Sequence, residues 1–166
     1  MSNKFYMIIE GIKGPVQVAG FTGAFELDEF NDIGIRNPFA ADNGNGQSYG
    51  GVPDISPIAV TLNNVKGSVS CKLMKEVLDA TSLKSVTVYE IAKLKGKETS
   101  TYDITLNNPH ILSYERHSSS GDEDGAQISL VLGNLSSIMV NHVDIDGEGA
   151  TTQFKVKYDL QKQITS

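Results

Sequence analysis

The chain has 166 residues, of which 39% are hydrophobic and 20% charged, and this composition suits one ordered globular domain over residues 1–166. The formal net charge of −6 argues against nucleic acid or an anionic membrane surface as a partner, because both attract clusters of Lys and Arg. The only cysteine, Cys71, excludes an intrachain disulfide and a cysteine metal cluster.

The N-terminal segment has one short apolar run, Phe5–Ile9, which ends at Glu10. A secretory signal needs a longer apolar core and a small-residue cleavage site, and no segment approaches the ~20 apolar residues that span a bilayer. We therefore expect a soluble chain made in the cytoplasm, which leaves the cell only by a route that needs no cleaved leader. The aromatic and branched residues of the run predict a first strand.

Two further strands are predicted before residue 31. Val16–Val18 follows a Gly-Pro turn and reads as a short second strand. Ala24–Phe30 alternates well, with Phe25 and Leu27 on the buried side. The alternation shifts at Phe30, which indicates a β-bulge.

The segment from Asn37 to Pro57 has a different character, with many Gly, Asn and Pro residues and little periodicity. It is predicted to be a long loop. Loops of this length are uncommon in compact domains and are usually either functional or without fixed structure. Both interpretations stay open, and Phe39 and Tyr49 favour a loop that contacts a partner.

One helix is predicted, over Gly67–Thr81, with Ser68 as its N-cap. At about 100° per residue, a wide apolar face forms on one side. That face consists of Val69, Cys71, Leu73, Met74, Val77, Leu78 and Ala80, which makes Cys71 a predicted core residue. The opposite face carries Lys72, Lys75, Glu76 and Asp79.

Strands surround this helix in sequence. Ile58–Leu62 precedes it, followed by a turn at Asn63-Asn64, and Ser85–Ile91 follows it with apolar residues on both faces. Thr99–Tyr114 reads as a long strand with a corner at 107–109, because proline cannot donate a ladder hydrogen bond.

The C-terminal third continues the strand pattern after an exposed polar turn at Arg116–Gly125. Ala126–Leu132 and Ser136–Ile145 are predicted to pair with each other, Asp146-Gly147 makes a hairpin turn, and Phe154–Leu160 forms a last strand with one wet face. The fold class is therefore mainly β. We expect an antiparallel β-barrel or sandwich of about eight strands, with one amphipathic helix packed on its side.

The chain offers little sign of catalysis. His117 and Ser118–Ser120 lie near Asp122 and Asp124, which are the residue types of a hydrolase triad, but a triad is assembled through the fold rather than within one turn. His142 lies in a predicted strand and reads as a surface histidine. Asp144–Gly149 resembles the start of a calcium loop without its later ligands. We expect no enzyme activity, no cofactor and no metal site.

The order of elements resembles the hemolysin-coregulated tube protein family of bacterial type VI secretion systems. The likeness covers nearly the whole chain, in the runs FYMIIEGIKGPV, ELDEFNDIGIRNP, DISPIAVTLNNVKGSVSCKLMKEVLDATSLKSVTVYEI, TYDITLNNPHILSYERHSSSGDEDGAQISLVLGNLSSIMVNHV and TQFKVKYDL. The chain lacks the Trp and the early His common in that family, and Phe25 or Phe30 occupies the place of the Trp. It therefore resembles a divergent member or a tube protein of a related contractile apparatus.

The resemblance implies a β-barrel protomer that forms homohexameric rings. The rings stack into a tube that a contracting sheath expels with cargo, so it also implies sheath, spike-tip and effector proteins as partners. The alternative is a monomeric secreted β-sandwich that binds a ligand through residues 37–57.

In the tube interpretation, self-association is expected at four residues: Phe39, Tyr49, Arg116 and His117. The resemblance also implies a lumen-facing helix surface made of Lys72, Lys75, Glu76 and Asp79.

Overall fold

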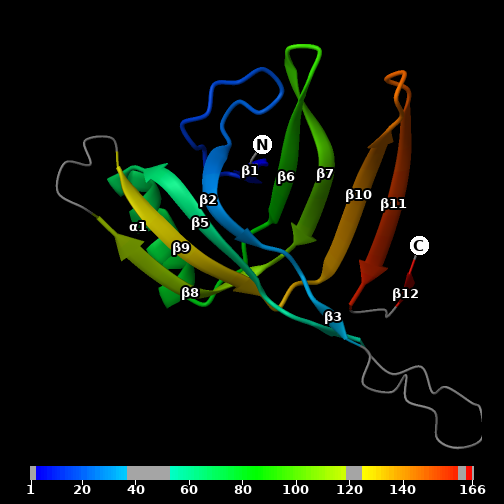
Figure 1. Cartoon of the computed structure of the whole chain (residues 1–166). Helices are drawn as coiled ribbons and strands as arrows, with labels where there is room; N and C mark the ends of the chain where they lie inside the picture. The colour runs from blue at the N-terminus through cyan, green and yellow to red at the C-terminus, as the bar shows by residue number, and fades with distance from the viewer. Residues whose placement is uncertain (1–2, 37–52, 119–124, 161–163, 166) are drawn as a thin grey trace, which may run out of the picture.

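The computed structural model describes residues 3–36, 53–118, 125–160 and 164–165 (Figure 1). Ten strands form one antiparallel sheet in the order β12-β11-β10-β7-β6-β1-β2-β5-β9-β8, and β3 and β4 form a separate pair. The elements are β1 Lys4–Ile9, β2 Phe25–Asn31, β3 Ile35–Arg36, β4 Asp54–Ile55, β5 Ile58–Val65, α1 Gly67–Leu78, β6 Ser85–Leu94, β7 Lys97–Asn107, β8 His110–His117, β9 Ala126–Gly133, β10 Ser137–Ile145, β11 Thr151–Asp159 and β12 Ile164–Thr165.

The predicted mainly β fold with one helix is confirmed, although the described residues contain twelve strands rather than eight. The sheet curves so that one face encloses the main core, which draws side chains from β1, β2, β5, β6, β7, β9 and α1. Buried residues alternate along these strands, as in β9, because alternate side chains point to the same face.

The other face of β1 and β6 is covered by the segment that joins β1 to β2. Tyr6, Phe21, Ala24 and Ile91 form a second buried cluster there, while Val86 and Val88 enter the main core, so the apolar residues on both faces of β6 are packed. The predicted strand Val16–Val18 is wrong. The segment is held by a few turn hydrogen bonds, including Val16 N to Ala24 O at 3.1 Å, and forms no ladder.

Irregularities in the strands were predicted with mixed success. The bulge in β2 is confirmed, because the register against β5 shifts between Leu27 and Glu29. The turn at Asn63-Asn64 is wrong: both residues lie within β5, and Asn64 takes a positive φ of 56° at a second register shift. The predicted loop is wrong near its end, because Asp54–Ile55 forms β4, and residues 37–52 of it lie outside the described residues.

The pairing of β9 with β10 is wrong. β9 pairs with β5 and β8, whereas β10 pairs with β7 and β11 on the far side of the sheet. The corner at Asn108-Pro109 is confirmed. It separates β7 from β8, which also lie in different parts of the sheet: β7 between β6 and β10, and β8 beside β9. Alternation identifies a strand but carries no information about its partner, so the sequence did not reveal these crossings.

Helix α1 ends at Leu78, three residues before the predicted end, and Ala80 takes a positive φ of 53° just beyond it. The predicted cap at Ser68 is wrong. Ser70 N already donates to Lys66 O at 2.9 Å, which places Ser68 inside the first turn, and Lys66 is an N-cap without a side-chain bond. The helix contacts β8 at one end of the sheet.

Candidate assembly surfaces

The helix buries only half of its apolar face. Leu73 is fully buried in the core, and Val69 and Val77 are half-buried against it. The other apolar residues, Cys71, Met74 and Leu78, are exposed, with Met74 at 43% and Leu78 at 77%. The prediction of Cys71 as a core residue is therefore wrong, because the sheet covers a narrower arc of the helix than the sequence pattern spans. We call Cys71, Met74 and Leu78 the helix stripe.

A second exposed apolar area lies on β11, at the other end of the sheet. Cross-strand pairing places Val88, Ile104, Val140 and Val156 in one row on the core face of β6, β7, β10 and β11. Burial falls along this row: Val88 and Ile104 are 0% exposed, Val140 is half-buried and Val156 is 55% exposed. The core face thus continues onto β11 without a cover among the described residues.

The neighbouring row extends this exposed area. Tyr102 on β7, His142 on β10 and Phe154 on β11 are register partners, and the Tyr102 and His142 rings lie 4.6 Å apart between centroids. Phe154 is 54% exposed. We call Val140, His142, Phe154 and Val156 the β11 patch. The prediction of a last strand with one wet face is wrong, because every residue from 151 to 157 is exposed.

The opposite face of the same strands mixes polar and apolar side chains: Asn141 and Lys155 lie beside Met139, Val143 and Ile145. Asn141 Nδ2 donates to Asp103 Oδ1 at 3.2 Å, and half-burial raises the pKa of Asp103, partly offset by the Asn141 bond and by the Lys155 charge.

A hydrogen bond crosses the edge of the core beside the β11 patch. Tyr102 Oη donates to Asp32 Oδ2, which lies just after β2. Burial first, and this bond to a carboxylate second, raise the pKa of Tyr102 well above its ordinary value. The contact joins the two sides of the curved sheet where the covered core ends.

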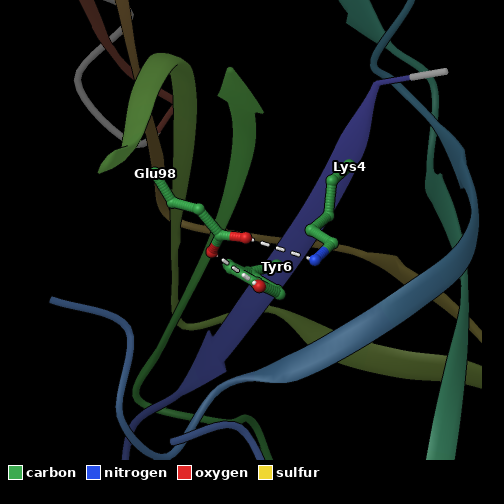
Figure 2. A network of polar contacts seen from close by, with 3 residues as sticks. All are labelled: Lys4, Tyr6 and Glu98. Atoms are coloured by element: carbon green, nitrogen blue, oxygen red, sulfur yellow. Dashed lines mark hydrogen bonds and ion pairs between the residues drawn. The ribbon is translucent and has the colours of Figure 1, made fainter. Parts of the chain in front are cut away.

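A second polar contact lies on the outer face of β1 (Figure 2). Tyr6 Oη donates to Glu98 Oε2 at 2.8 Å, and Lys4 Nζ lies 3.2 Å from Glu98 Oε1. The Tyr6 hydrogen bond, followed by Lys4, lowers the pKa of Glu98, and burial raises the pKa of Tyr6. The network links β1 to the β6–β7 hairpin and holds no group placed for catalysis.

Of the residues of the hypothetical triad, the structure describes only His117 and Ser118, and Ser119 and Ser120 lie outside the described residues. His117 lies at the exposed end of β8, and its Nε2 is 3.5 Å from Glu115 Oε2. Asp122 and Asp124 lie outside the described residues. Over the described ranges, no group of three His, Cys, Asp or Glu side chains is placed to hold a metal ion. Asp146 Oδ1 instead accepts from the backbone N–H groups of Glu148 and Ala150, which confirms the hairpin turn.

The predicted assembly residues fall into three places. Phe39 and Tyr49 lie outside the described residues. Arg116 and His117 are exposed at the end of β8. Lys72 and Lys75 are exposed on α1, and Asp79 is exposed as its C-cap. Glu76 is half-buried and accepts a hydrogen bond from Thr81.

The sequence interpretation missed the helix stripe and the β11 patch as surfaces. It placed Cys71, Met74 and Leu78 on an apolar helix face, and Phe154 and Val156 on the apolar side of the last strand, and took both as buried, whereas it read His142 as a surface residue. The width of the apolar helix face could have revealed the helix stripe, because an arc of seven apolar residues on one short helix is wider than a single sheet contact covers.

A family model described as type VI secretion system effector, Hcp, matches residues 6–162. No curated protein sequence matches the chain. In the part of the chain that the structure describes, α1 is too short and too polar to cross a membrane.

Several solved structures share the fold. Hcp1 from Salmonella typhimurium has a TM-score of 0.71 at 14% identity, with 100% of each chain covered. A type six secretion system protein has a TM-score of 0.82 at 14% identity, with 99% of this chain and 100% of the other covered. A type VI secretion system effector from Yersinia pestis has a TM-score of 0.63 at 15% identity, covering 93% and 98%.

Proposed function

Because this chain belongs to the Hcp family of type VI secretion system proteins, we propose that it is a structural subunit of a type VI inner tube. In this function it forms hexameric rings that stack and are exported with cargo effectors. The observation that carries the proposal is the family match over residues 6–162, together with a fold shared along the full length of solved family structures. Its partners are then other copies of itself and the sheath, spike-tip and effector proteins of the apparatus.

The exposed apolar surfaces support self-assembly. Proteins that stay monomeric rarely expose adjoining large apolar side chains. Phe154 and Val156 are two such side chains on β11. Within the described residues, the outer edge of β11 is paired only at Tyr158 and Asp159. A ring covers such faces and edges by repeating one contact.

Stacking is assigned to the segment 37–57, with Phe39 and Tyr49 as anchors, and to Arg116 and His117 on another rim. Lys72, Lys75, Glu76 and Asp79 are assigned to the lumen. Reversing the exposed charges, as in Lys72→Glu with Lys75→Glu, should then change cargo handling while rings persist, which co-purification of cargo with rings would measure.

The test of the function is the mass and shape of the purified chain. We expect light scattering to give six times the 17.9 kDa chain mass and negative-stain microscopy to show rings. A strictly monomeric protein at high concentration would count against the tube and favour the binding module that recognises a ligand through residues 37–57.

Stacking is tested separately with Tyr49→Ala, compared with Gln47→Ala in the same segment as a matched control. We expect Tyr49→Ala alone to weaken stacking without unfolding the protomer, as judged by circular dichroism. Unchanged stacking would remove Tyr49 from the assembly surface and leave the ring itself untouched.

A further inference from the structure

A second row of side chains crosses the open end of the core face, next to the row that ends at Val156. Cross-strand pairing places Glu90 of β6, Tyr102 of β7, His142 of β10 and Phe154 of β11 side by side on that face. Glu90 and Tyr102 are half-buried, whereas His142 and Phe154 are exposed. Figure 1 shows these four strands in succession, with both hairpin turns at the upper end of the molecule.

The centre of this row is a pair of aromatic rings. The Tyr102 and His142 rings lie 4.6 Å apart between centroids at an interplanar angle of 56°. Because His142 is exposed, its ring is open to a partner. Aromatic faces attract cations, and the planar guanidinium of arginine stacks on them.

Three carboxylates surround the ring pair. Asp32 accepts a hydrogen bond from Tyr102 Oη, Glu90 stands directly opposite Tyr102, and Asp144 lies two residues beyond His142 on the same face. Burial and the Asp32 hydrogen bond raise the pKa of Tyr102 most, and the negative charges of Asp32 and Glu90 raise it further. Negative potential is therefore concentrated at the rings.

These carboxylates have no cationic partner within the part of the chain that the structure describes. Neither of the two ion pairs among the described residues involves them. Asp32 accepts from the Tyr102 hydroxyl and Glu90 from the Asn3 amide, and both donors are neutral. The negative charge beside the rings is therefore left uncompensated by these contacts.

The lysines of the neighbouring strands lie elsewhere. Lys155 and Lys157 alternate with Phe154 and Val156, so they lie on the opposite face of β11. On β6 and β7, the one lysine on the core side is Lys97, which lies beside the hairpin turn. The rings and carboxylates thus form a surface that is complementary to a cation.

The chemistry of this surface favours arginine, and it favours a different protein over a second copy. A guanidinium both stacks on a ring and donates several hydrogen bonds to carboxylates, whereas the ammonium of lysine does not stack. Identical copies of this chain each carry a net charge of −6 and only two arginines, Arg36 and Arg116. A basic partner meets no such repulsion.

We propose that the exposed end of this row binds an arginine side chain of a basic partner protein, in a site made of Tyr102, His142, Asp32, Glu90 and Asp144. The guanidinium stacks on the exposed imidazole and donates to the carboxylates around it. This partner chemistry goes beyond the proposed tube assembly and does not rest on it. The exposed Phe154 and Val156 that support self-assembly border the site without forming it.

The test uses a fluorescein-labelled peptide of alternating glycine and arginine as its probe. Two matched peptides replace every arginine by lysine or by citrulline, which is a neutral isostere of arginine. Fluorescence anisotropy at low salt measures their binding to the wild-type protein. We expect the arginine peptide to bind roughly tenfold more tightly than the citrulline peptide, because only the charged group makes charge-assisted hydrogen bonds. Equal binding of the two peptides would overturn the proposal.

Variants of the carboxylates separate a local site from general attraction to an acidic protein. Asp144→Asn and Glu90→Gln should each weaken binding of the arginine peptide about fivefold. Glu26→Gln is the matched control, because it removes the same charge from the outer face of β2, opposite Tyr6, and should leave binding unchanged. Circular dichroism checks that each variant folds. An equal loss in Glu26→Gln would show attraction by net charge alone and would contradict the site.

The aromatic part of the site has its own readout. His142→Ala removes the exposed ring, so it should weaken binding of the arginine peptide more than binding of the lysine peptide. The same loss for both peptides would rule out stacking and with it the preference for arginine.

Light scattering on the same samples separates this inference from the tube function. Rings that bind no arginine peptide would overturn the site and leave the tube standing. A protein that stays monomeric but prefers the arginine peptide would support the site and contradict the tube. Binding by diluted protomers but not by rings would show that a second copy covers the site, which would overturn the assignment to a basic partner.

Discussion

The covered and bare ends of the row Val88, Ile104, Val140 and Val156 differ in environment rather than in residue type. Val88 and Val156 are the same amino acid on the same face of the same sheet, yet the first is 0% exposed and the second 55%. The core sets Val88 among side chains of β5 and β9 across the curve of the sheet, whereas Val156 is not part of it. An alternating strand therefore specifies a face, and the curvature of the sheet decides whether anything covers it.

This comparison predicts its largest effect at Ile104. Ile104→Ala removes a fully buried side chain and leaves a cavity, so the free energy of unfolding should fall by about 2–5 kcal/mol. Val156→Ala removes a half-solvated side chain and should cost less than about 1 kcal/mol in the protomer. Urea denaturation of both variants at one low protein concentration measures the difference.

The comparison of Val156→Ala with Ile104→Ala becomes more informative at higher protein concentration. Assembly stabilises whatever it covers, so the cost of Val156→Ala should grow with concentration while that of Ile104→Ala stays large throughout. Equal costs at low concentration would mean that the two ends of the row are equally packed in the single chain.

Tyr102 stands at the border between the two ends. Tyr102→Phe keeps the ring beside His142 and removes the hydrogen bond to Asp32, and we expect it to lower the free energy of unfolding by about 1 kcal/mol. Asp32→Asn is the matched control, because it keeps an acceptor oxygen but removes the charge and should cost less.

Tyr102 should also make the free energy of unfolding depend on pH in the alkaline range. The folded protein raises the pKa of Tyr102 above its ordinary value of 10.0, so it favours the neutral phenol. This contribution to stability is complete below pH 10 and is lost as the pH rises further. The ultraviolet titration of wild type minus Tyr102→Phe should therefore show a step above pH 10. A step at pH 10 itself would contradict the buried, hydrogen-bonded phenol.

Local features of the fold were predictable from sequence because they depend on neighbouring residues. The hairpin turn at Asp146-Gly147 is one case, where Asp146 Oδ1 accepts hydrogen bonds from the backbone N–H groups of Glu148 and Ala150 between β10 and β11. The bulge near Phe30 is another, because the alternation of apolar and polar residues breaks there in the sequence. The strand after the helix was also recognised as apolar on both faces, since Val86 and Tyr89 lie on opposite sides, but its predicted cover by the helix was not, because α1 contacts β8.

Long-range features were not predictable in the same way. β9 and β10 are consecutive and alternate well, but their partners are chosen by the packing of the whole sheet. The candidate surfaces show the same limit. Phe154 and Leu78 were assigned correctly to apolar faces, and exposure depends on a cover that no local pattern encodes. The resemblance to a family led to the expectation of assembly, whereas the exposed surfaces became visible only in the folded structure.

The smallest predicted effect lies on the reverse face of the covered half, at Glu98. Its pKa is lowered in the folded protein by the Tyr6 hydrogen bond and Lys4, so its contribution to stability is complete above its unfolded value of about 4.5 and is lost as the pH falls through the lower folded value. Because Lys4 and Glu98 are partly exposed, Glu98→Gln should cost less than about 1 kcal/mol at pH 7. The difference from wild type should shrink below pH 4.5 in urea denaturation. It should not change with protein concentration, because this network belongs to the protomer and not to the bare end of the sheet. A cost that grew with concentration would instead place Glu98 at a contact between copies.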